Sequence, residues 1–164
     1  MSEYKKIIDT IRKFNRFYTV NMGFLNSNYL DSSYSVAETW ILFEIKMNES
    51  CTQSDIVKIL HIDKSYLSRI VQRLCTRGIM QKIKSEDDKR TTKITLTEMG
   101  KKETDRLIEL TNMQIGAKVA GLSKEDCNEL CDALNTIILI LGKEVNWYED
   151  YWVWRKISKG FYWF

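Results

Sequence analysis

Basic side chains are concentrated in one short part of this 164-residue chain. Residues 64–93 contain nine Lys or Arg residues and three acidic residues, a net charge of +6, whereas the whole chain carries only +3. Because lysine and arginine neutralise phosphates, a local positive field on a nearly neutral body is typical of nucleic-acid binding. The nine basic residues are Lys64, Arg69, Arg73, Arg77, Lys82, Lys84, Lys89, Arg90 and Lys93.

The first part of this basic segment has the pattern of an amphipathic helix from Lys64 to about Arg77. Asp63 is placed to cap its N-terminus, and Gly78 supplies a left-handed residue after its C-terminus. No acidic residue occurs within this helix, although exposed helix faces usually mix both signs of charge. A carboxylate there would be repelled by phosphate, so the composition favours a DNA-binding helix. The buried face is predicted to contain Leu67, Ile70, Val71 and Leu74.

A β-hairpin is predicted directly after this helix, with strands over residues 80–85 and 91–96 joined by the polar residues 86–90. Two short helices precede the helix that begins at Lys64, and Ser35 and Thr52 are placed to cap their N-termini. Three short helices followed by a hairpin form a winged helix-turn-helix. In that arrangement the third helix fits the major groove of DNA, and the hairpin reaches over the backbone toward the adjacent minor groove.

The candidate DNA contacts lie in the third helix and at the hairpin tip. Arg69 is placed to make a bidentate contact to guanine, and Lys89 and Arg90 lie at the tip. The alternative is a winged helix that docks on another protein, without sequence-specific DNA binding. The complete set of candidate DNA-binding residues is Lys64, Ser65, Tyr66, Ser68, Arg69, Gln72, Arg73, Lys89 and Arg90.

Three short motifs follow one another in and after the third helix. They read Leu-Ser-Arg-Ile-Val-Gln-Arg-Leu at 67–74, Asp-Lys-Arg at 88–90 and Leu-Thr-Glu-Met-Gly at 96–100. With these motifs, residues 34–100 resemble the MarR (multiple antibiotic resistance) family of regulators.

The resemblance implies an obligate two-fold dimer with a triangular, all-helical body. It also implies a repressor that a small ligand releases from DNA. For individual residues, it implies that Asp88 shapes the wing and that Arg90 enters the minor groove.

Long helices are predicted on both sides of the winged domain, over residues 4–26, 97–119 and 123–141. The winged domain is too small to bury the apolar stripes of the terminal helices, so we expect a second copy of the chain to cover them. A two-fold dimer would present its recognition helices about one turn of DNA apart.

The expected fold is therefore mainly α-helical with a small β-hairpin wing. The predicted organisation is an N-terminal dimerisation helix and loop (1–33), a DNA-binding domain (34–97), C-terminal dimerisation helices (98–146) and an aromatic tail (147–164).

Aromatic residues dominate this tail, where they occupy nine of eighteen positions. Left exposed, so much apolar surface would promote aggregation. We therefore expect the tail to pack on the body or on the partner subunit, as a strap that reinforces the dimer. The alternatives are a lid over an effector pocket and a docking site for another protein.

An effector pocket is expected between the dimer helices and the winged domain, since a ligand there would change the spacing of the recognition helices. The candidate lining residues are Phe14, Tyr18, Trp40 and Phe43. The alternative is that these four side chains belong to the ordinary core.

Catalysis and metal binding have little support in the sequence. The chain has one histidine and neither a glycine-rich phosphate loop nor a metal-ligand cluster, so we expect no enzyme activity, metal or cofactor. Cys127 and Cys131 fall on an apolar stripe and are expected in the core, the alternative being a metal or redox pair. Cys51 precedes a helix N-terminus, where a lowered thiol pKa would permit a redox switch.

The expected location is the reducing cytoplasm. Four cysteines are too few for a disulfide scaffold, and neither a transmembrane run nor a signal peptide is recognised. The sequence therefore predicts a dimeric, sequence-specific regulator that binds double-stranded operator DNA, responds to a small-molecule effector and makes no membrane contact.

Overall fold

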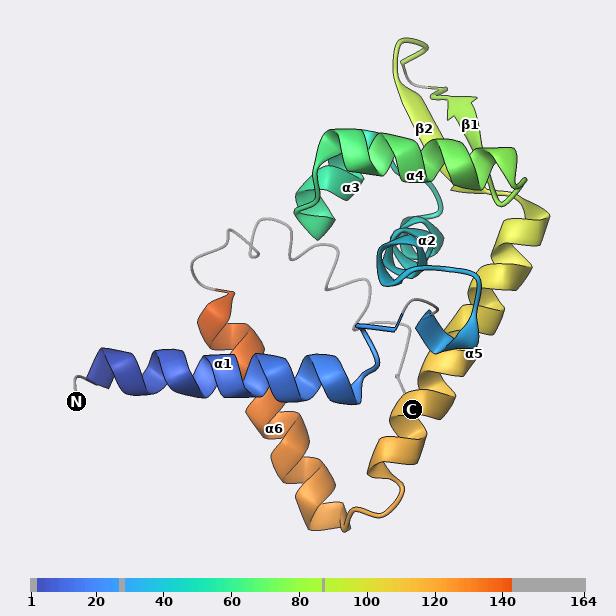
Figure 1. Ribbon diagram of the computed structural model, residues 1–164. Helices are drawn as coiled ribbons and strands as arrows, with labels where there is room; N and C mark the ends of the chain where they lie inside the picture. Colours follow the sequence, from blue (N-terminus) through green and yellow to red (C-terminus); the bar gives the residue numbers. More distant parts are fainter. Residues whose placement is uncertain (1–2, 27–28, 87, 143–164) are drawn as a thin grey trace.

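The computed structural model describes residues 3–26, 29–86 and 88–142. Within them the protein is mainly helical and has one antiparallel hairpin, as predicted (Figure 1). The elements in chain order are α1 (Glu3–Asn21), the short helix η1 (Tyr29–Asp31), α2 (Val36–Asn48), α3 (Gln53–Leu60), α4 (Lys64–Thr76), β1 (Met80–Lys84), β2 (Thr92–Leu96), α5 (Glu98–Val119) and α6 (Lys124–Leu141).

Side-chain caps begin five of these helices. Each N-cap residue has an extended backbone, and its side-chain oxygen accepts a hydrogen bond from a backbone N–H in the first turn of its helix. The predicted caps at α2, α3 and α4 are thereby confirmed. The N-cap residues are Ser35, Thr52, Asp63, Thr97 and Ser123.

The first helix is shorter than predicted, because α1 ends at Asn21 instead of residue 26. Gly23 has a φ of +66°, a left-handed conformation that a helix cannot continue through. Its backbone N–H donates to the carbonyl of Val20 at 3.1 Å, and its own carbonyl accepts from Asn26 at 3.1 Å. The chain therefore turns away from the axis of α1 five residues earlier than expected.

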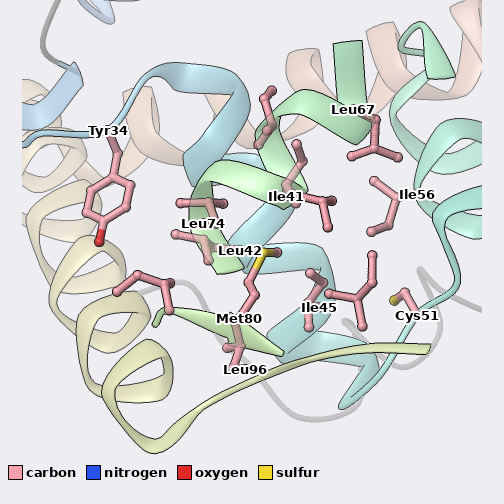
Figure 2. Packing of buried hydrophobic residues seen from close by; sticks show 14 of the residues in the cluster. Tyr34, Ile41, Leu42, Ile45, Cys51, Ile56, Leu67, Leu74, Met80 and Leu96 are labelled. Atoms are coloured by element: carbon pink, nitrogen blue, oxygen red, sulfur yellow. The ribbon is translucent and has the colours of Figure 1, made fainter. Parts of the chain in front are cut away.

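One hydrophobic core unites α2, α3, α4, the hairpin and the first half of α5 (Figure 2). The predicted buried face of α4 is confirmed, since Leu67, Ile70, Val71 and Leu74 are all buried. An isolated bridge between Cys51 and Ile94 joins the segment before α3 to β2 on the side away from β1. This bridge fixes the base of the hairpin against the helices.

The junction between the hairpin and α5 is tightly packed. The Thr97 hydroxyl donates to the carbonyl of Gly78 at 2.6 Å, and the Thr97 backbone N–H donates to the carbonyl of Ile79 at 3.1 Å. A Cβ added to Gly100 would lie 1.9 Å from that same Ile79 oxygen. Only glycine permits this approach of α5 to the segment between α4 and β1.

Helices α1 and α6 lie on the side of the molecule away from the hairpin, and α5 runs between the two sides (Figure 1). No residue of α6 is buried, and several large apolar side chains of α1 are exposed within the single chain. The prediction that Cys127 and Cys131 lie in the core is therefore wrong for one copy, where Cys127 is half-buried and Cys131 exposed. The predicted packing of the tail concerns residues 147–164, which lie outside the described residues.

None of the helices in the described ranges combines the length and apolarity needed to cross a membrane.

Candidate nucleic-acid interface

The outward face of α4 is polar and contains most of the candidate DNA contacts. Ser65, Ser68, Arg69 and Gln72 are exposed, and together with Lys64 they line a hollow of about 750 Å³ to which Gln53 and Asp63 also contribute. Gln53 lies in the first turn of α3 and was not among the predicted DNA contacts. Tyr66 is exposed beside this face. The structure therefore gathers the predicted α4 residues onto one accessible surface.

Asp63 lies at the edge of this surface and places one carboxylate there. It accepts hydrogen bonds from the Ser65 hydroxyl and from the Tyr66 backbone N–H, at 2.8 Å for the latter. These bonds lower the pKa of Asp63, so the carboxyl group is ionised at neutral pH. Since its hydroxyl hydrogen is directed to Asp63, Ser65 offers mainly lone pairs to a bound partner.

Arg73 lies on the flank of α4 and is paired with α2. Its Nε donates a hydrogen bond to Oε1 of Glu38 at 2.9 Å, and its Nη2 forms an ion pair with the same oxygen at 2.8 Å. The Glu38 side chain is 5% exposed and that of Arg73 is 55% exposed. Arg73 was predicted to contact DNA, but this ion pair, which joins residues 35 positions apart in the sequence, was not predicted.

Arg77 is also held by the body of the protein. Its Nη2 donates to the Ser33 hydroxyl at 3.0 Å, and its guanidinium lies 4.3 Å from the centre of the Tyr34 ring. This stacking is a cation–π contact that fixes the C-terminal end of α4. The cations of α4 are therefore divided between an outward face and a side anchored to the body.

The wing presents Lys89 and Arg90, both exposed, at the tip of the hairpin. Asp88 organises this tip: its Oδ1 accepts from the Arg90 backbone N–H and its Oδ2 accepts from the Thr91 hydroxyl, both at 2.9 Å. These two bonds lower the pKa of Asp88. The geometry supports the shaping role that the resemblance implied for this residue.

The tip should lose this organisation in acid. The lowered pKa means that the Asp88 carboxylate stabilises the folded tip at neutral pH, and that this contribution is lost as the pH falls below the ordinary carboxyl value of about 3.9. In NMR spectra we expect the Arg90 amide resonance to follow this titration. The Asp88→Asn variant should remove that pH dependence, and an unchanged titration in the variant would contradict the assignment.

The four candidate effector residues are not brought together. Phe14 and Tyr18 stack on one another along α1, with ring centres 5.6 Å apart, and Phe43 packs against the hydrophobic core. Trp40, by contrast, lines a hollow of about 500 Å³ between α2, the end of α3 and the start of α4. The other residues lining it are Phe24, Asn26, Ser35, Val36, Ala37, Leu60, Ile62 and Tyr66.

Cys51 has the environment of a structural thiol. It is buried, and desolvation, with the nearby charges of Asp55 and Glu44, raises its pKa to about 12. The redox-switch alternative required a lowered pKa and is contradicted by this environment. Among the described residues, no group of three or more His, Cys, Asp or Glu side chains could hold a metal ion.

The buried thiol should be chemically inert in the native protein. With a pKa of about 12, almost none of Cys51 is thiolate at pH 7.5, and burial excludes the reagent as well. Peptide mass spectrometry after iodoacetamide treatment should find Cys51 unmodified in the native chain and modified in urea. Equal modification in both states would show that the thiol is accessible in solution.

The fold and the exposed basic surface define a winged helix-turn-helix protein. Residues 32–91 match the model of the MarR family. Over 120 residues the chain is 24% identical to the HTH-type transcriptional regulator BilQ of Clostridium symbiosum, covering 73% of this chain and 81% of BilQ. The matched segment is the winged domain, and the chain is similar there to transcriptional regulators of the MarR family.

Two solved structures illustrate the shared fold. A cysteine-to-serine mutant of E. coli MarR, complexed with operator DNA, aligns with a TM-score of 0.67 and 21% identity, covering 84% of this chain and 99% of that one. Bordetella bronchiseptica BpsR, whose DNA binding is regulated by 6-hydroxynicotinic acid, aligns with a TM-score of 0.64 and 19% identity. The alignment covers 79% of this chain and 98% of BpsR.

Proposed function

We propose that this protein is a homodimeric, sequence-specific repressor that binds double-stranded operator DNA in the cytoplasm and responds to a small molecule. The observation that carries the proposal is the exposed outward face of α4, where Ser65, Ser68, Arg69 and Gln72 lie together. This face has the size and donor groups to read base edges in the major groove. Lys64 and Tyr66 border it, and Lys89 and Arg90 extend the contact to the minor groove. The proposal includes no catalytic step.

The proposed dimer uses the two helices that the single chain leaves uncovered. Leu130, Leu134 and Ile138 follow one another along α6 at spacings of four residues and are exposed, as are Ile7 and Ile11 on α1. Packing these faces against a second copy removes them from water. In this proposal residues 1–33 and 98–146 form the dimer, residues 34–97 bind DNA, and residues 147–164 reinforce the dimer.

The effector proposal rests on the hollow beside Trp40. It lies where Tyr66 of α4 meets the start of α2, so a ligand bound there would contact the recognition helix. BpsR, which shares the fold, has its DNA binding regulated by a small aromatic acid, and this supports a ligand-responsive mechanism for the present chain.

A mobility-shift assay on the DNA upstream of its own gene, at two salt concentrations, tests the proposed function. If each subunit neutralises about five phosphates, log affinity should fall with log salt at a slope near −9. A shift that survives competitor DNA and weakens in this way supports the repressor. If no shift survives competitor, the winged helix acts as a protein-docking module.

Two alanine variants separate base reading from phosphate contact. Arg69→Ala should weaken operator binding by about 1–3 kcal/mol and relax the preference at one base pair of each half-site. Arg90→Ala should weaken binding to all sequences more evenly and reduce the salt slope by about one per half-site. Fluorescence anisotropy with operator and scrambled duplexes measures both effects. Unchanged affinity in both variants would overturn the proposed docking.

A further inference from the structure

Two arginines of α4 and the arginine that caps its C-terminus differ in what they contact. Arg69 lies on the outward face, whereas Arg73 and Arg77 are anchored to other parts of the protein. Arg73 remains half-exposed, one turn of helix after Arg69, so a bound duplex would pass close to it. Its ion pair with Glu38 decides whether the positive charge of Arg73 is available to neutralise a DNA phosphate.

Glu38 is bound on both of its oxygens. Oε1 accepts a hydrogen bond from Arg73 Nε and forms an ion pair with Arg73 Nη2, and Oε2 accepts from the backbone N–H and the hydroxyl of Ser35, at 2.8 and 2.9 Å. The same carboxylate therefore caps the N-terminus of α2 and holds the flank of α4.

Breaking the Arg73–Glu38 ion pair would cost free energy, because it would leave a buried carboxylate unpaired. If Arg73 turned toward a phosphate, a carboxylate that is 5% exposed would lose its charged partner inside the protein. Arg73 would gain in exchange only a partly solvated contact at the edge of the recognition surface. The balance favours an intact pair in the DNA complex, and an intact pair has no net charge.

We propose that Glu38 is a positioning and specificity-determining residue, which cancels the charge of Arg73 and fixes the recognition helix against α2. This inference rests on the proposed function. In consequence, Arg73 orients the helix but does not contribute to counterion release. Sequence-independent attraction to the phosphate backbone is lower than the number of basic residues on α4 implies, and the share of binding that depends on base contacts is larger.

The experiment compares the salt dependence of DNA binding for four proteins: the wild type, Glu38→Gln, the double variant Glu38→Gln/Arg73→Met, and Lys64→Met. Glutamine keeps an oxygen that accepts from Arg73 and removes only the charge. The double variant removes both charges, so the local net charge equals that of the wild type. Lys64→Met is the control, because its loss should reduce the slope by about one per half-site if the assay resolves one cation.

We expect Glu38→Gln to steepen the slope by about one per half-site, so that between 50 and 200 mM salt its affinity falls by about tenfold more than that of the wild type. Its preference for operator over scrambled duplex should decrease. The double variant should keep the wild-type slope. Melting temperatures establish that each variant is folded at the assay temperature.

The opposite pattern overturns the inference. Suppose that the salt slope of the double variant is smaller than that of the wild type by about one per half-site, while Glu38→Gln keeps the wild-type slope. Arg73 would then contact phosphate as a free cation. If instead the wild type binds neither duplex in a salt-dependent way, the proposed function itself fails, and Lys64→Met then has no effect either.

Discussion

Replacing Gly100 by alanine should lower the stability of the winged domain by about 1–3 kcal/mol or more, the usual range for an added methyl group in a closely packed site. The new Cβ would lie 1.9 Å from the Ile79 carbonyl oxygen, and a backbone atom cannot move aside as a flexible side chain can. Urea unfolding followed by circular dichroism measures the change.

Gly116→Ala is the matched control for this variant. It lies in the same helix, and a Cβ added there would meet no other atom within 4 Å. Alanine has the higher helix propensity, so this control should be slightly more stable than the wild type. If the two variants unfolded at the same urea concentration, the close approach at Gly100 would not exist in solution.

Replacing Ile138 by aspartate should separate the proposed dimer. Ile138 is 47% exposed in the single chain and lies on the apolar face of α6, which the proposed dimer buries. Burying an unpaired carboxylate costs several kcal/mol, and each 1.4 kcal/mol corresponds to a factor of ten. We therefore expect dimerisation, and operator binding with it, to weaken by at least about 100-fold, as measured by sedimentation and anisotropy.

Thr136→Asp is the control for the dimer experiment. Thr136 is exposed on the opposite side of α6, where its hydroxyl donates to the carbonyl of Asp132. A charge there should leave the dimer intact. A monomeric wild type, or a dimer unaffected by Ile138→Asp, would place the subunit contact elsewhere.

Local features of the winged domain could be predicted because each depends on a few neighbouring residues. Asp63 caps α4 through its own first turn, and Gly78 has the left-handed φ of 70° that the chain needs after it. The two faces of α4 follow from its helical period alone. The exposed candidate residues of α4 were therefore placed correctly on its outward face.

Features that depend on packing between distant segments could not be predicted in this way. Helical periodicity shows that Arg73 lies on a flank, but only the packing of α2 beside α4 brings Glu38 to it. The burial of Cys51 depends on its bridge to Ile94, which lies 43 residues further along the chain. Phe14 and Phe43 were grouped by residue type, although their helices direct them to different surroundings.

The continuous helix α5 also has a mechanical consequence. Its 22 residues extend roughly 33 Å from the hairpin to the turn before α6, and its first half is built into the winged core. A swing of about 10° at that turn would displace the far end by roughly 6 Å. Base pairs are stacked about 3.4 Å apart. This small rotation would therefore shift the recognition helix by almost two base pairs relative to the recognition helix of the proposed partner subunit.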